Sequence, residues 1–206
     1  MKLRAELLAD GGEAASGADF FRSPGFLEAE GTTHSLVVNK DGDADARVFS
    51  APLVVREIPG TDRKDAISPY AYPGVSLPDT PADGVSLPVD PSDIDFSGTG
   101  LVTLFLRHAL GPVVPLLGPT GRNLCLLSDP SLPRKSRMSD RQQIRKNLKR
   151  GYTLEIVPGP ESSTEQRAGF LTAYTETMRR TDAADRYFFD RDYFGLILAE
   201  ESTWLV

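Results

Sequence analysis

Six prolines between residues 68 and 91 constrain the fold of this chain more than any other feature. They are Pro69, Pro73, Pro78, Pro81, Pro88 and Pro91. Proline has no backbone N–H to donate to a helix or to a central strand, so this segment is predicted to be largely loop. A loop of this length is long for a compact domain, and long loops tend to be functional or mobile.

Two β-branched runs before this loop predict strands. Residues 34–39 read HSLVVN and residues 47–58 read RVFSAPLVVREI. Pro52 predicts a bend in the second strand, because it cannot donate to the strand ladder. Upstream, residues 18–30 mix aromatic and polar side chains at helical spacing. The break at Ser23-Pro24-Gly25 divides them into two predicted short helices.

Further elements are predicted after the loop. The apolar run at residues 101–107, LVTLFLR, has the length of a helix segment or a strand, and its β-branched and aromatic content favours a strand. Residues 123–128 predict a short buried strand, and the alternation in residues 152–157, YTLEIV, predicts another. Between them, a helix is expected from Ser136 or Ser139 to Arg150, with Gly151 as its stop.

The last third of the chain predicts two helices and a final strand. Ser162 and Glu165 have the spacing of a capping box, which opens a helix with one apolar face. That face holds Phe170, Leu171, Tyr174 and Met178. Asp190 is a predicted N-cap for a helix that carries Tyr193, Phe194, Ile197 and Leu198. This order of elements predicts a mixed α/β fold, with a mostly antiparallel sheet flanked by helices.

Composition excludes several classes of protein. The chain has 206 residues, of which 40% are hydrophobic and 25% charged, so it can bury a core. No stretch approaches the roughly 18 consecutive apolar residues that a membrane-spanning helix needs. The N-terminal sequence MKLRAELLADGGEAASG lacks the apolar region of a signal peptide, so a cytoplasmic location is expected.

Cysteine and histidine are too few for several kinds of site. Cys125 is the single cysteine, which excludes an intrachain disulfide framework and a cysteine-based zinc site. His34 and His108 are the only histidines, so no multi-histidine metal site is expected. The Walker P-loop and the glycine-serine-glycine nucleophile elbow are both absent. No Ser-His or Cys-His arrangement is evident, and the catalytic residues stay unknown.

A basic segment stands out in an otherwise acidic chain. Residues 134–150 hold eight basic residues and one acidic residue, although the whole chain has a formal net charge of −6. On a helix, Arg137, Arg141 and Arg145 are successive neighbours, with Lys146 beside them. Such clustered cations predict binding of phosphates from a nucleotide or an RNA backbone. The alternative is a solvated helix face.

Two other clusters are candidates for a binding site. In residues 68–74, SPYAYPG, two prolines fix Tyr70 and Tyr72 and Gly74 ends the turn, which predicts a stiff aromatic ledge for a ligand. The alternative is a loop that packs its own aromatics on the core. Farther on, Arg179 in YTETMRR predicts a clamp for a phosphate or carboxylate. Its alternative role is to complement the helix dipole.

Taken in order, these segments resemble the FemAB branch (peptidoglycan-bridge peptidyltransferases) of the GNAT acyltransferase superfamily. The likeness covers residues 18–206. It rests on the SPYAYPG loop and on three later runs, which are LVTLFLRHAL, RMSDRQQIRKNLKRGYTLEI and FLTAYTETMRRTDAADRYFFDRDYFGLIL. Family members show an SPYxYxG loop, an RxxIRKxxKxG helix and a YxxTMxR…YFF…YF stretch. Each motif alone is weak, but their order and spacing are fairly specific.

The resemblance implies a two-domain enzyme that forms an amide bond. Its GNAT-like first domain holds an amine-bearing or nucleotide-linked acceptor, and Thr177 and Arg179 fall where the family contacts acceptor phosphates. The implied donor is aminoacyl-tRNA or acyl-CoA, used as a co-substrate rather than a tightly bound cofactor. The residues that act on the acyl group lie in the second domain, so this chain alone is expected to be inactive.

The resemblance also sets domain boundaries. Residues 1–201 would form the first GNAT-like domain, and residues 202–206 the opening strand of a missing second one. A strand cut off in mid-pattern suggests a truncated protein, and the alternative is a short last strand that closes a sheet edge. The turn that grips acetyl-CoA in other GNAT enzymes has its nearest match at residues 166–171, and this match fails at its last position.

Two departures from the family bear on the acceptor. Glu28 and Glu30 stand where cell-wall members have a lysine, and an acid there would repel a diphosphate. Some members have an aromatic residue where this chain has Ala183. A composition rich in Ala, Arg, Asp and Pro is typical of high-GC bacteria, in which an acceptor from natural-product or exopolysaccharide biosynthesis is the alternative to one from murein (peptidoglycan). A second hypothesis is a non-catalytic module that binds RNA or another polyanion through residues 137–150.

Overall fold

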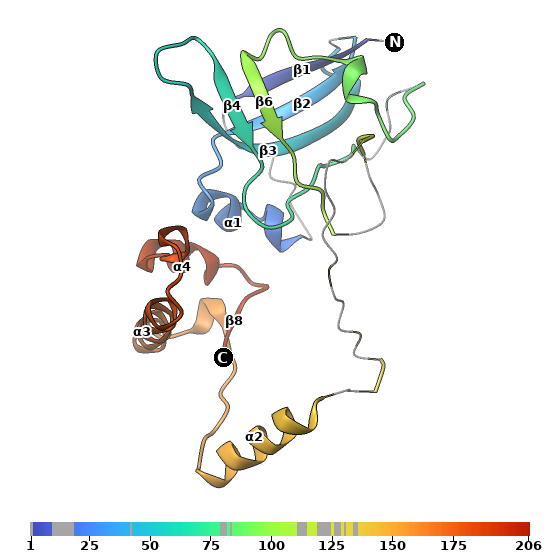
Figure 1. Cartoon of the computed structure of the whole chain (residues 1–206). Helices are drawn as coiled ribbons and strands as arrows, with labels where there is room; N and C mark the ends of the chain where they lie inside the picture. Colours follow the sequence, from blue (N-terminus) through green and yellow to red (C-terminus); the bar gives the residue numbers. More distant parts are fainter. Residues whose placement is uncertain are drawn as a thin grey trace.

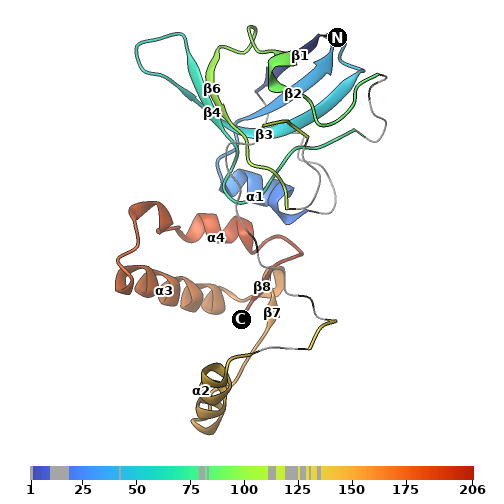
Figure 2. The ribbon, with the colours of Figure 1, turned by 45° about the vertical axis from the view of Figure 1, so that its right-hand side comes forward.

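The structure is a computed structural model of the whole chain (Figure 1). It describes residues 2–9, 19–41, 43–78, 82, 84–110, 115–118, 125, 129, 131–133 and 136–206. A curled sheet forms one end of the molecule, and helices α3 (Thr164–Arg180) and α4 (Arg191–Ile197) lie apart from it. Helix α1 (Pro24–Ala29) lies between them and packs on α4 (Figure 2).

The sheet has six strands in the order β5-β1-β2-β3-β4-β6. Their bounds are β1 Leu3–Leu8, β2 His34–Lys40, β3 Arg47–Glu57, β4 Lys64–Ile67, β5 Ile94–Asp95 and β6 Leu101–Phe105. The inner pairs are antiparallel, and only the outer pairs β1/β5 and β4/β6 are parallel. The prediction of a mixed α/β fold with a mostly antiparallel sheet is therefore confirmed.

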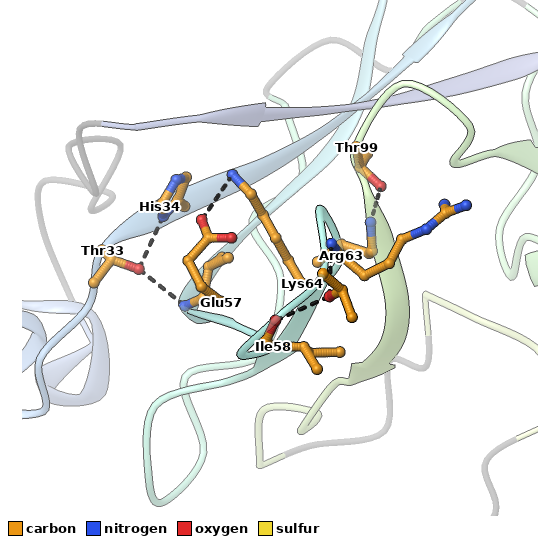
Figure 3. A network of polar contacts seen from close by, with 10 residues as sticks. Thr33, His34, Glu57, Ile58, Arg63, Lys64 and Thr99 are labelled. Atoms are coloured by element: carbon orange, nitrogen blue, oxygen red, sulfur yellow. Dashed lines mark hydrogen bonds and ion pairs between the residues drawn. The ribbon is translucent and has the colours of Figure 1, made fainter.

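Strand β3 joins the two halves of this sheet. Its first half pairs with β2 as far as Leu53, and its second half pairs with β4 from Val54 onward. Pro52 lies next to this changeover, so its missing N–H falls where the partner of the strand changes. Polar contacts surround the same region (Figure 3): the Val55 N–H donates to Thr33 Oγ1 at 2.9 Å, and Lys64 pairs with Glu57 at 3.3 Å.

The core lies against the sheet. Leu3, Leu36, Val38, Phe49 and Leu53 are completely buried there. The proline-rich segment packs over this core through partly buried side chains, and Ser76 forms an isolated bridge with Ser50 of β3. That segment is largely irregular, as its prolines predict.

The early and late helices form close to their predicted positions. A 3₁₀ turn over Phe20–Arg22 precedes α1, and Ser23 separates the two, as the sequence predicts. Helix α2 (Met138–Lys149) is confirmed, and Asp190 caps α4 by accepting from the Tyr193 N–H at 2.9 Å. No helix in the described part of the chain is both long enough and apolar enough to cross a membrane.

Two local predictions are wrong. Residues 152–156 are irregular, and only Val157 of the predicted strand belongs to β7 (Val157–Pro158), because β8 (Trp204–Leu205) pairs with just these two residues. The capping box lies one residue later than predicted and uses Ser163 and Gln166. Ser162 instead donates its hydroxyl to the Gly159 carbonyl at 2.5 Å. The strand predicted at residues 123–128 lies outside the described residues, except for Cys125.

Candidate functional site

The loop of residues 68–74 is buried at both ends, and between them one tyrosine side chain projects into solvent. Ser68, Pro69 and Pro73 are almost completely buried, whereas the Tyr70 side chain is 56% exposed. Ala71 has a φ of 67°, a left-handed conformation that is strained for a residue with a Cβ atom. Strain of this kind persists only where the surrounding structure fixes the backbone. The loop is therefore a rigid support that presents Tyr70.

Arg107 locks this loop to the end of β6. Its Nη1 donates to the Ser68 carbonyl at 2.6 Å and to the Pro69 carbonyl at 3.2 Å. Its guanidinium lies 5.6 Å from the centre of the Tyr70 ring and 5.2 Å from that of Phe105. Phe105 is 55% exposed. Two accessible rings thus flank one cation, an arrangement that stabilises the cation through the ring faces.

Two residues that follow helix α3, Arg186 and Tyr187, extend this arrangement. Arg186 Nη2 donates to the Tyr187 hydroxyl at 3.3 Å, and the Tyr70 side chain contributes to a lowered pKa of Tyr187. Arg186 also lies over the Tyr187 ring, and its charge and hydrogen bond lower the pKa of that tyrosine. We call the set of Phe105, Arg107, Tyr70, Tyr187 and Arg186 the aromatic–arginine row. It could hold a ligand that offers a planar face and a negative charge.

Glu30 connects the Tyr70 loop to helix α4 through two hydrogen bonds, a connection that we call the Glu30 brace. Its Oε2 accepts from the Tyr70 N–H at 3.2 Å, and its Oε1 accepts from the Tyr193 hydroxyl at 2.8 Å. Burial raises the pKa of Tyr193, and the hydrogen bond to Glu30 raises it further. The tyrosine therefore keeps its proton and stays a donor. One carboxylate thus ties the loop, the end of α1 and helix α4 together.

We expect Glu30→Ala and Tyr193→Phe each to lower the free energy of unfolding by about 1.5–3 kcal/mol, the range for a hydrogen bond to a charged group. The double variant should lose clearly less than the sum of the two, because both changes remove the same bond. Urea unfolding of the four proteins measures this coupling. Glu28→Ala, at an exposed position in the same helix, is the control and should change little. Additive losses at Glu30 and Tyr193 would contradict the brace.

Tyr72 faces different partners from Tyr70. Its ring packs edge-on against Phe21 at 5.9 Å, and its hydroxyl accepts from the Cys125 thiol at 3.5 Å. This hydrogen bond raises the pKa of Tyr72. The two tyrosines therefore do not form one continuous ledge: Tyr70 belongs to the aromatic–arginine row, and Tyr72 secures the loop. Self-packing, the alternative for this loop, describes Tyr72, and a ligand-binding role for Tyr70 stays a prediction.

Thr177 and Arg179 lie near the end of α3. The Arg179 side chain is exposed and has no hydrogen-bond or ion-pair partner among the described residues. One turn earlier, Tyr174 donates its hydroxyl to the Tyr187 carbonyl, which connects α3 to the aromatic–arginine row. No hydrogen bond or ion pair in the described part of the chain joins Arg179 to the Tyr70 loop. The role of Arg179 as a clamp for a phosphate or carboxylate stays a prediction.

The third group of predicted site residues lies elsewhere. Arg141, Arg145 and Lys146 are exposed on α2, which extends away from the rest of the molecule in both views (Figures 1 and 2). The predicted residues therefore fall at three places: the Tyr70 loop, the end of α3 and helix α2. Of these predicted residues, only Tyr70 belongs to the aromatic–arginine row.

Sequence reasoning missed five of the residues around Tyr70. They are Phe105, Arg107, Arg186, Tyr187 and Glu30, of which Glu30 was considered only as a departure from the family. A cation that directly follows an apolar strand was the available signal for Arg107. Among the described residues, no three His, Cys, Asp or Glu side chains gather as a metal site would require.

Comparison of the chain with protein-family models, with curated proteins and with solved structures finds no match.

Proposed function

We propose that this chain is the acceptor-binding half of a FemAB-like N-acyl- or aminoacyltransferase with a GNAT-type fold. The observation that carries the proposal is the rigid SPYAYPG loop, which projects Tyr70 beside Arg107 and Phe105. It occurs in a mixed α/β fold, together with the basic helix and the YTETMRR segment in the order of that family.

The proposed reaction is attack of an acceptor amine on an activated acyl group. The amine nitrogen bonds to the carbonyl carbon of aminoacyl-tRNA or acyl-CoA and loses a proton, and the C–O or C–S bond to the carrier breaks. The contribution of this chain is to hold the acceptor in place, and such positioning supplies a large part of the rate in a two-substrate reaction. Both kinds of donor are cytoplasmic molecules, so the proposal includes a cytoplasmic site of action.

The acceptor is proposed to bear an anionic group that Arg179 binds, with Thr177 beside it. Arg179→Ala should weaken binding of such an acceptor by about 1.5–3 kcal/mol, the range for a charge-assisted hydrogen bond. Arg179→Lys should recover little, because a point charge does not replace a two-pronged donor. Calorimetric titration with a nucleotide-linked muropeptide and with a phosphorylated amine of similar size measures both variants.

Arg180→Ala is the matched control, since Arg180 is exposed in the same last turn of α3. It should keep acceptor affinity. A melt of each variant separates the two roles of Arg179: a lower melting temperature with unchanged affinity would make Arg179 a helix-end residue, worth about 0.3–1 kcal/mol to stability.

The function itself is tested by transfer. A protein that contains this chain and the second domain, incubated with charged tRNA or acyl-CoA and with amine acceptors, should form an amide. The Tyr70→Ala variant should raise the acceptor KM more than it lowers kcat. The absence of transfer from every charged tRNA and acyl-CoA would count against the whole class.

A further inference from the structure

Helix α2 stands apart as an exposed basic and apolar element. Eleven of its twelve residues are exposed and only Asn147 is half-buried. No side-chain hydrogen bond or ion pair joins it to another element of the described chain; the hydrogen bond from Gln143 to Asn147 lies within the helix. An isolated helix of this length is marginal in water, so a partner surface would stabilise it.

The two halves of this helix differ in chemistry. At 3.6 residues per turn, Ile144, Leu148, Arg141 and Arg145 fall on one half. Asp140, Gln143 and Asn147 fall on the other, and the last two are hydrogen-bonded to each other. Most of the cations thus share one side with the apolar side chains, and the other side holds one cation, Lys146, besides neutral and acidic side chains.

The apolar side chains of this region are accessible to solvent. Ile144 is 57% exposed and Leu148 is 65% exposed. Directly after the helix, the irregular residues 152–156 expose three more large side chains, which are Tyr152, Leu154 and Ile156. This stretch therefore offers apolar and positive surface together.

We propose that α2 and residues 152–156 form a docking element for an anionic phospholipid surface. The helix lies in the plane of the headgroups, with Ile144 and Leu148 inserted among them. The stems of Arg141 and Arg145 cover apolar surface while their guanidiniums reach the lipid phosphates. Charge complementarity supports the anionic partner, since α2 and its flanking residues carry six cations and one acid: Arg137, Asp140, Arg141, Arg145, Lys146, Lys149 and Arg150.

An RNA backbone offers the same phosphates but leaves Ile144, Leu148 and Leu154 in water. Affinity for RNA comes from phosphate contacts and from stacking on aromatic rings, of which this region has only Tyr152. The three aliphatic side chains therefore favour lipid over RNA.

Co-sedimentation with vesicles tests the proposal. The chain should bind vesicles of phosphatidylcholine mixed with phosphatidylglycerol, and not vesicles of phosphatidylcholine alone. A cation near an anionic surface changes membrane binding about fivefold, so Arg141→Gln/Arg145→Gln should lower the partition coefficient by about twentyfold. The matched control is Arg180→Gln/Arg191→Gln, which removes the same charge from exposed helix ends and should bind as the parent does.

A second variant separates lipid from other partners. Ile144→Gln/Leu148→Gln keeps the charge and the helix propensity but should lower vesicle binding by about tenfold or more. The control Leu110→Gln/Leu132→Gln changes two other exposed leucines and should leave binding unchanged. Far-UV circular dichroism and a melt check that each variant stays folded.

Three results would overturn the proposal. One is no binding to phosphatidylglycerol vesicles, or equal binding to neutral ones. Another is tight, salt-sensitive binding of a single-stranded RNA oligomer that Ile144→Gln/Leu148→Gln leaves intact, which would make α2 an RNA-binding helix. The third is a dimer, detected by sedimentation, that the same variant dissociates while vesicle binding is absent.

Discussion

Gly74→Ala is expected to lower the free energy of unfolding by about 2–5 kcal/mol. Gly74 has a φ of 63°, where an added Cβ costs about 1–2 kcal/mol. That Cβ would also lie 2.6 Å from the Cβ and 2.7 Å from the backbone nitrogen of Ala109. Overpacking of this kind costs a further 1–3 kcal/mol or so, because one of the two backbone segments must move. Urea unfolding measures the loss.

Gly84→Ala separates the two causes. Gly84 has a similar φ of 73°, but an added Cβ there would meet no atom within 4 Å. This variant should show only the backbone cost. The double variant Gly74→Ala/Ala109→Gly should recover part of the loss, since it removes one of the two clashing atoms. If Gly74→Ala and Gly84→Ala lost the same stability, the loop would not be packed tightly on Ala109.

The shape of this loop could be predicted from local sequence, but most of its partners could not. The two prolines restrict φ and the glycine permits a positive φ, so the conformation of the turn depends on seven adjacent residues. Glu30, in contrast, lies 40 residues from Tyr70 and 163 residues from Tyr193. Such contacts follow from how the sheet and helices pack, and no local pattern encodes them.

The strands missed by sequence reasoning show the same limit. Strand β1, LRAELL, consists largely of good helix formers, yet all six residues pair with β2. Strand β4, KDAI, has two charged residues, and its Asp65 pairs with Arg56 of β3 at 2.8 Å. Tertiary pairing overrides local propensity in both cases. The opposite error occurs at residues 152–156. Their alternating apolar and polar side chains predict a strand, but no strand among the described residues pairs with them.

Arg22→Met is expected to stabilise the protein by about 1–4 kcal/mol. Arg22 is 6% exposed, and its Nε and Nη2 are buried without a hydrogen-bond partner among the residues that the structure describes. Burial lowers the pKa of this guanidinium, an effect that Asp19 opposes only in part. An unpaired buried charge costs several kcal/mol, and replacing a buried ionic group by an apolar one of similar volume often stabilises by this amount.

Thermal and urea unfolding of Arg22→Met measure this gain, and Arg180→Met, at an exposed position, should change stability little.

The sign of the change in stability matters because it distinguishes two states of Arg22. A gain means that folding leaves the guanidinium without a favourable partner. A loss of stability would contradict the expectation, since it would mean that Arg22 has a favourable anionic partner in solution. Melts of the parent and of Arg22→Met at rising phosphate concentration would then test for an exchangeable anion. Phosphate stabilises folded proteins in general, so a bound anion is indicated only by a rise in melting temperature that is larger in the parent than in Arg22→Met.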